Sequence, residues 1–321
     1  MTTKIVYVLT SNTNDYYLEQ AILSMYSLRM HNPNVTIILV TDQDTANSFT
    51  GNRKQIYSYI SKLICVKVPA KYDILQKSRY LKTTLRKQLE GDYLYIDTDT
   101  IIADDISEID DFPYDVAAVL DKHLPIQIHT AREYIRELAK QFEWEIPENG
   151  NYFNSGVMYV KDSQLSHKLY DTWHKLWQNG IDNLSVNIDQ PSLAKANEKN
   201  GYLIHELNGI YNCQLIENGL KYLFDAKIIH YFAANIGTSW DCPYLFRESK
   251  LYAQVREYGI TEEIHTMLSN AKSAFHTKCT IIAGNQADVY GTPLAGIARR
   301  LSRRYPFINK ILRGIIKKYN Y

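Results

Sequence analysis

The feature that most constrains the fold of this chain is a regular alternation between short apolar runs and segments whose apolar residues recur at helical spacing. The runs predict strands at 4–9, 35–40, 63–68, 93–96, 115–120, 156–160 and 227–230. The helical segments lie near 16–31, 76–90, 130–142, 163–178 and 244–272. This alternation favours a mostly parallel α/β sheet flanked by helices. Ligands bind such a sheet outside the carboxyl ends of its strands, so the polar residues after each run are the candidate site.

The length of 321 residues is enough for one large α/β domain with an appendage. We expect a catalytic domain over residues 1–243, a small helical C-terminal subdomain over 244–293 and a basic amphipathic tail over 294–321. The four cysteines are far apart, which argues against a zinc site and against a disulfide framework. The run at 4–9 is too short for a signal peptide or a membrane span, so we expect a cytoplasmic protein.

The tail carries the strongest charge bias of the chain. After Asp288 there is no acidic residue, and the basic ones are Arg299, Arg300, Arg303, Arg304, Lys310, Arg313, Lys317 and Lys318. Apolar residues such as Leu294, Ile297 and Leu301 are interleaved with them. Such a segment can lie on an anionic membrane surface, and packing on the body or an oligomer contact is the alternative. The rest of the chain is acidic, so we expect no nucleic-acid partner.

Two carboxylates, Asp97 and Asp99, directly follow the predicted strand at 93–96. Strand periodicity places them on the same side, where they can bind a hard divalent cation that also contacts phosphate. A polar strand end that caps a turn is the plain alternative. The same letters also resemble the haloacid-dehalogenase phosphatases, in which Asp97 would be the nucleophile. Three predicted strands precede the motif here, whereas in that family it stands near the start of the domain.

Six segments stand out in order along residues 4 to 240: KIVYVLTSN, SRYLK, YLYIDTDTII, YFNSGVMYV, NIDQPSL and IIHYF. Together they resemble glycosyltransferase family 8, the retaining enzymes that include glycogenin and bacterial lipopolysaccharide galactosyl- and glucosyltransferases. The resemblance implies a GT-A fold, with a Rossmann-like sheet. It also implies a metal-dependent hexosyltransferase that moves galactose or glucose from a UDP-sugar to a saccharide acceptor. The bacterial relatives extend lipid-linked oligosaccharides, which implies a peripheral place at the inner face of the cytoplasmic membrane.

The resemblance also implies a metal site and a catalytic pair. His230 would complete the metal shell opposite Asp97 and Asp99, a ligand set that suits Mn²⁺ and also admits Mg²⁺. Asp189 would bind the donor sugar, and Gln190 would lie beneath the anomeric carbon. Retention then follows either a same-face substitution or a covalent intermediate on Asp189, and the sequence leaves both open. The alternatives are a structural histidine and a polar helix start.

The remaining family positions would hold the nucleotide sugar. They are Thr10, Ser11, Asn12 and Tyr17 at the uridine base, Arg79 and Lys82 at the diphosphate or a sugar hydroxyl, and Thr98, Asp121, Asn154, Ser155 and Gly237 elsewhere around the donor. The alternatives are a helix N-cap for Ser11 and Asn12, a solvated helix face for Arg79 and Lys82, and a tight turn at 154–156.

One departure from the family concerns the loop after His230. Many members carry a glycine followed by Lys-Pro-Trp, whereas this chain has Gly237-Thr238-Ser239-Trp240 and lacks the phosphate-binding lysine. Charge on the leaving diphosphate would then be neutralised by the metal and by Arg79 or another base. The missing lysine is also what favours a further alternative, a non-catalytic module that binds a sugar nucleotide.

Overall fold

The computed structural model describes residues 1–233, 243–276, 289, 292–307 and 310–311. The chain divides into two compact units, Met1–Cys279 and Thr280–Tyr321. The expected divisions after residues 243 and 293 stay predictions.

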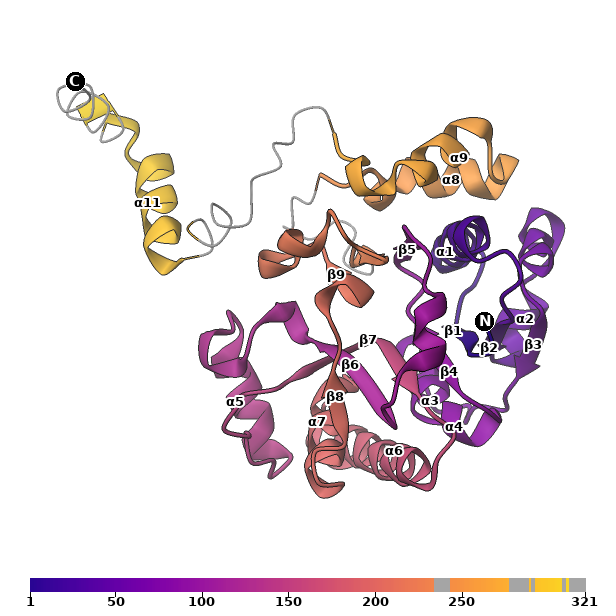
Figure 1. Cartoon of the computed structure of the whole chain (residues 1–321), viewed down its shortest axis with the longest axis horizontal. Helices are drawn as coiled ribbons and strands as arrows, with labels where there is room; N and C mark the ends of the chain where they lie inside the picture. Colours follow the sequence, from indigo (N-terminus) through magenta and orange to yellow (C-terminus); the bar gives the residue numbers. More distant parts are fainter. Residues whose placement is uncertain (234–242, 277–288, 290–291, 308–309, 312–321) are drawn as a thin grey trace. The chain divides into compact units, whose positions relative to one another are not determined.

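A seven-stranded sheet forms the centre of the first unit (Figure 1), with the order β3-β2-β1-β4-β7-β6-β8. Its strands are β1 (Lys4–Leu9), β2 (Ile37–Thr41), β3 (Lys62–Cys65), β4 (Tyr93–Ile96), β6 (Val116–Leu120), β7 (Phe153–Val160) and β8 (Ile204–Glu206). β7 runs antiparallel to both of its neighbours, and the other neighbouring strands pair in parallel. The predicted mostly parallel α/β sheet is therefore confirmed.

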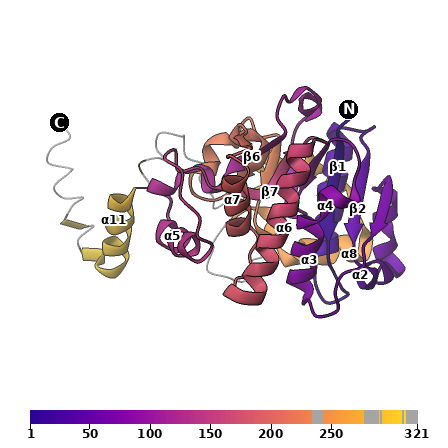
Figure 2. The same cartoon turned by 90° about the horizontal axis from the view of Figure 1, so that it is seen from below.

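Helices cover both faces of this sheet (Figures 1 and 2). One face packs against α1 (Tyr17–His31), and α8 (Ser249–Tyr258) packs on α1 and shares its hydrophobic cluster with α9 (Glu262–Ser269). The other face packs against α3 (Ile74–Thr83), α4 (Leu85–Gln88), α6 (Gln164–Leu184) and α7 (Gln190–Lys199). After Lys4 the residues of β1 are all apolar because they are buried on both faces of the sheet. Tyr7 packs in the cluster on the α1 side, while Val6 and Val8 pack in the cluster on the α3 and α6 side.

Several elements differ from the sequence prediction. The helix expected at 76–90 is two helices, α3 and α4, on either side of Thr84. The segment expected as one helix at 244–272 divides into α8 and α9 because Gly259 has φ +73° and Thr261 caps the second helix. The other helices are α2 (Gln43–Asn47) and α5 (Arg132–Gln141).

The sequence analysis predicted only part of a second, three-stranded sheet. It consists of β5 (Thr100–Ile102), β10 (Ile228–His230) and β9 (Cys213–Gln214), in that order. Strands of two or three residues are too short to show the alternation by which strands are recognised. Only β10 was expected, at 227–230.

In the second unit, α11 spans Pro293–Arg304 and begins at Thr292, whose side chain accepts the N–H of Ala295. Leu294, Ile297 and Leu301 are exposed on this helix. Among the helices of the described residues, none combines the length and the apolar character that crossing a bilayer requires.

Candidate functional site

A cavity of about 260 Å³ lies at the carboxyl ends of β1 and β4. The predicted residues that line it are Thr10, Tyr17, Arg79, Lys82, Asp97, Thr98, Asp99, Asn154, Ser155, Asp189, Gln190 and His230. Residues far apart in the sequence thus meet at the sheet edge where ligands of open α/β sheets bind. Ser11, Asn12 and Asp121 are outside this lining, and Gly237 lies outside the described residues.

The antiparallel direction of β7 brings its first residues beside the end of β4. The N–H of Asp97 donates to the carbonyl of Gly156 at 2.7 Å. A Cβ atom on Gly156 would lie 2.5 Å from Cε1 of His230 and 2.8 Å from Oδ2 of Asp97. Glycine is therefore required here so that these two polar side chains can approach the same strand.

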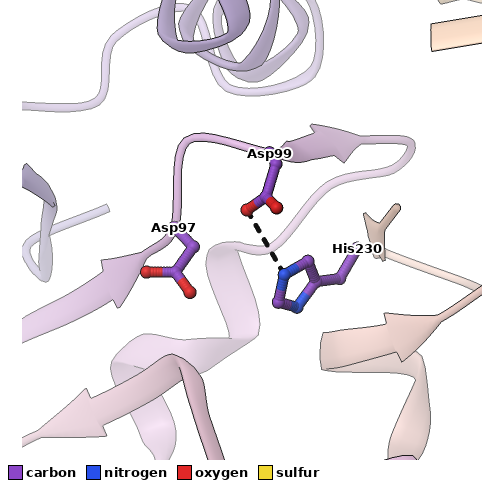
Figure 3. Close-up of side chains that lie close together, drawn as sticks. All are labelled: Asp97, Asp99 and His230. Atoms are coloured by element: carbon purple, nitrogen blue, oxygen red, sulfur yellow. Dashed lines mark ion pairs between the residues drawn. The ribbon is translucent and has the colours of Figure 1, made fainter. Parts of the chain in front are cut away.

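Asp97, Asp99 and His230 form a cluster in which one ligand atom from each lies within 4.8 Å of the others (Figure 3). Nε2 of His230 is 3.3 Å from Oδ1 of Asp99. Burial opposes ionisation of Asp99, but His230 and the N–H of Ala233 outweigh it and hold the pKa of this carboxyl below its usual range. Asp99 is therefore a carboxylate at neutral pH.

A hydrogen-bond chain fixes how the imidazole of His230 is presented. Oδ1 of Asn154 accepts the N–H of Gly156 at 2.9 Å and the side-chain amide of Asn212 at 3.0 Å. The Asn212 oxygen is then free to accept from Nδ1 of His230 at 3.1 Å. Nε2 consequently faces Asp99, and on loss of its proton it could offer its lone pair to a cation. Two carboxylates and an oriented imidazole are a donor set that fits Mn²⁺ or Mg²⁺.

Beside this cluster lies a group of two cations and a carboxylate, in which Lys82 and Asp189 are buried and Arg79 is partly exposed. Nζ of Lys82 is 3.4 Å from Oδ1 of Asp97 and 3.5 Å from Oδ2 of Asp189, and it donates to Oγ of Ser155 at 3.0 Å. Nε of Arg79 is 3.0 Å from Oδ1 of Asp189. Burial opposes ionisation of Asp189, yet Lys82 and Arg79 hold its pKa below the usual range. Both basic residues thus line the cavity instead of forming a solvated helix face.

Asp121 reaches the cavity through other side chains. It accepts hydrogen bonds from Nδ2 of Asn154 at 2.9 Å and from Nε2 of His129 at 3.0 Å. Burial opposes its ionisation, but these bonds keep its pKa below the usual range. Nδ1 of His129 accepts the N–H of Ala131, so the proton shared with Asp121 is on Nε2. Asp121 therefore orients the amide of Asn154, which does line the cavity.

Ser11 and Asn12 support the loop after β1 from below the cavity. Oγ of Ser11 accepts from Nη2 of Arg53 at 2.9 Å and donates to Oδ1 of Asp15 at 2.6 Å. The N–H of Asn12 donates to Oδ2 of Asp15 at 2.8 Å. These contacts order the loop, while Thr10 and Tyr17 on either side of it face the cavity.

Sequence reasoning missed other lining residues, among them Gln20, Ile74, Leu75, Ser78, Tyr95 and Phe232. Gln20 is three positions after Tyr17, and Ser78 is four before Lys82, so helical spacing could have found both. Phe232 has φ +52° and its ring stacks on His230 with centroids 4.0 Å apart. The sequence signal that could have identified Phe232 is its position two residues after His230.

The chain matches the family described as glycosyl transferase family 8 over residues 8–238. No curated protein matches it. It is similar to the apo structure of the bifunctional glycosyltransferase WbbM, with 15% identity, a TM-score of 0.55, and coverage of 83% of this chain and 51% of that one. It is also similar to the galactosyltransferase LgtC in complex with donor and acceptor sugar analogues, with 14% identity, a TM-score of 0.51, and coverage of 82% and 99%. Mouse xyloside xylosyltransferase 1 has 15% identity, a TM-score of 0.49, and coverage of 72% and 97%.

The likeness to WbbM and LgtC shows the GT-A fold. The family match covers well over half of the chain and includes every segment that contributes a predicted residue to the cavity, from Thr10 to His230. The chain belongs to glycosyl transferase family 8.

Proposed function

We propose that this glycosyltransferase is metal-dependent and moves a hexose, galactose or glucose, from a UDP-sugar to a saccharide hydroxyl with retention of configuration. The observation that carries the proposal is one cavity in which the Asp97, Asp99 and His230 cluster lies beside two cations, the partly buried Arg79 and the buried Lys82. A cluster of metal ligands next to fixed positive charge suits a diphosphate that gains negative charge as it leaves.

The donor would lie along the cavity from Tyr17 to Gln190. Tyr17 offers a half-buried ring for stacking on the uracil base. A divalent cation held by Asp97, Asp99 and His230 would neutralise the diphosphate. Arg79 contacts Asp189 through Nε and lines the same cavity, so its guanidinium can supply the charge of the lysine missing near Gly237.

In the proposed reaction, the acceptor oxygen bonds to the anomeric carbon while the bond from that carbon to the diphosphate oxygen breaks. The hydroxyl proton passes to that diphosphate oxygen. Gln190 lines the cavity, and its amide oxygen would stabilise positive charge at the anomeric carbon. Asp189 has one oxygen on Arg79 and the other on Lys82 and Ser155, which makes it a poor nucleophile. This supports same-face substitution over a covalent intermediate on Asp189.

A panel of UDP-hexoses tests the proposal. We expect one of UDP-galactose and UDP-glucose to raise the melting temperature of the full chain with Mn²⁺ but not with a chelator, and to be consumed with release of UDP when saccharides are added. No shift with any nucleotide, together with phosphate release from a phosphomonoester, would favour the phosphatase alternative. UDP binding without hydrolysis or transfer would favour the non-catalytic module.

We further propose a lipid-linked acceptor, with residues 294–321 on the anionic membrane surface. Exposed Leu294, Ile297 and Leu301 on α11 and the eight basic residues of the tail support this. The full chain should sediment with phosphatidylglycerol vesicles and not with phosphatidylcholine vesicles, since each basic residue contributes about 1 kcal/mol at an anionic surface. Leu294→Asp with Leu301→Asp should abolish sedimentation. Equal binding to both vesicle types, or to neither, would contradict the proposal.

A further inference from the structure

We infer that Arg256 on α8 is a positioning residue for the donor site, which holds the loop at residues 11–17 in the shape that presents Tyr17 to the nucleotide. The inference rests on the proposed function, because it assigns the base end of the cavity to that loop.

Arg256 holds the loop by its backbone. Nη1 donates to the carbonyl of Thr13 at 3.0 Å, and Nη2 donates to the carbonyl of Asp15. The guanidinium also lies over the ring of Tyr16, 4.6 Å from its centroid. A planar fork of donors can satisfy such divergent acceptors at once, which a lysine ammonium cannot do with the same geometry.

A buried carboxylate fixes the guanidinium in this position. Glu19 on α1 has 1% of its side chain exposed, and it accepts from Nε of Arg256 at 2.8 Å and from Nη2 at 2.9 Å. Arg53 approaches the same carboxylate at 3.7 Å and donates to Oγ of Ser11 on the loop. Two-pronged pairing of this kind fixes direction as well as distance. The loop is therefore held from two sides by arginines that share one buried acid.

The held loop in turn fixes a residue of the cavity. The side chain of Asp15 accepts from the N–H of Tyr17 at 3.1 Å and from Ser11 and Asn12. Tyr17 lines the cavity, and so does Gln20 one turn later on α1. Tyr252, also on α8, packs its ring against that of Tyr16 on the loop, with centroids 5.7 Å apart. α8 thus supports the loop that carries Tyr17 without lining the cavity itself.

α8 lies outside the residues that match the family. The family match ends at residue 238, and α8 begins at Ser249. A segment outside the matched residues therefore sets the shape of the donor pocket, through contacts made by Arg256 and Tyr252.

The test compares Arg256→Ala and Arg256→Lys with the unaltered full chain, with the UDP dissociation constant measured by calorimetry in the presence of Mn²⁺. We expect Arg256→Ala to raise this constant and the donor KM about tenfold, the effect of losing one or two charge-assisted hydrogen bonds. The kcat and the acceptor KM should stay unchanged, because Arg256 touches no reacting atom. Arg256→Lys, which keeps the charge on Glu19, should give a smaller rise. Lys250→Ala, on the same helix and 78% exposed, is the matched control and should change nothing.

A Tyr17→Ala background separates positioning from general destabilisation. If Arg256 acts through Tyr17, adding Arg256→Ala to the Tyr17→Ala variant should raise the UDP dissociation constant by less than about twofold. An equal tenfold effect in both backgrounds, or a fall in kcat with donor KM unchanged, would overturn the inference. Equal UDP affinity of the unaltered chain and of Arg256→Ala would overturn this inference and leave the proposed function standing. An unaltered chain that binds no UDP would overturn the proposed function as well.

Discussion

Replacement of Asp99 by asparagine is expected to lower the rate of glycosyl transfer at saturating donor by about a thousandfold, since a bound metal contributes several kcal/mol to stabilising a developing charge. Asp99 and His230 face each other at 3.3 Å, and the carboxylate supplies charge that asparagine lacks. The amide oxygen can still accept the N–H of Ala233, which Oδ2 now accepts at 3.0 Å. The fold should therefore persist while the metal site is lost.

The measurement is the transfer rate as a function of Mn²⁺ concentration, together with the melting temperature of each variant. Asp99→Asn should need far more Mn²⁺ and should not regain the full rate. Asp44→Asn is the matched control, because Asp44 is 82% exposed and is not among the residues that line the cavity. A variant at Asp99 with normal activity and an unchanged Mn²⁺ requirement would remove this residue from the metal site.

The cluster of Asp97, Asp99 and His230 could be predicted from the sequence for a physical reason. Asp97 and Asp99 directly follow a strand, His230 ends another, and strand ends are where an open sheet places its ligand-binding residues. The apolar run before each of these residues is continuous in the sequence, so the positions can be recognised without the structure. The central sheet was predictable on the same basis, because β1, β2 and β4 are apolar runs buried on both faces.

The residues that orient the cavity side chains by hydrogen bonds could not be predicted in this way. Asn212 orients His230 from η5 (Gly209–Asn212), a short 3₁₀ segment without periodicity. His129 contacts Asp121 only because the chain between them turns back through two left-handed residues, Lys122 and His123. Such contacts depend on loop conformation and on chain direction in space. For the same reason, no sequence pattern linked Arg256 to the loop at Asp15.

Asp121 shows how a position can be found and its contacts still be missed. The sequence placed it after an apolar run, which the structure confirms as β6, and predicted a role near the donor sugar. In the structure its carboxylate is already engaged by Asn154 and His129, and of these three residues Asn154 is the one that lines the cavity. The positions that follow strands identify which residues lie at the ligand-binding edge of the sheet. Their hydrogen-bond partners decide which of those side chains are open to a ligand.

The second large effect is expected at Asp189. Asp189→Asn should lower the free energy of unfolding at pH 7 by about 3 kcal/mol, the cost of breaking a buried ion pair by removing one partner. Nε of Arg79 loses the carboxylate at 3.0 Å, and Lys82 keeps only Asp97 among its acidic partners in the described residues. Urea unfolding of the two proteins measures this difference. Asp182→Asn, which removes half-exposed Asp182 from Lys71, should cost less than about 1 kcal/mol.

The pH dependence of this difference distinguishes an ion pair from simple packing. The pKa of Asp189 in the folded state is held below the ordinary carboxyl value of 3.8. Its charge therefore stabilises the fold above that value, and this stabilisation is lost as the pH falls through the lower, folded-state pKa. The gap between the two proteins should be constant from pH 7 to about pH 5 and should narrow below about pH 4. A gap that does not change with pH would mean that Asp189 acts by shape and hydrogen bonding, and that Arg79 and Lys82 are neutralised by other groups.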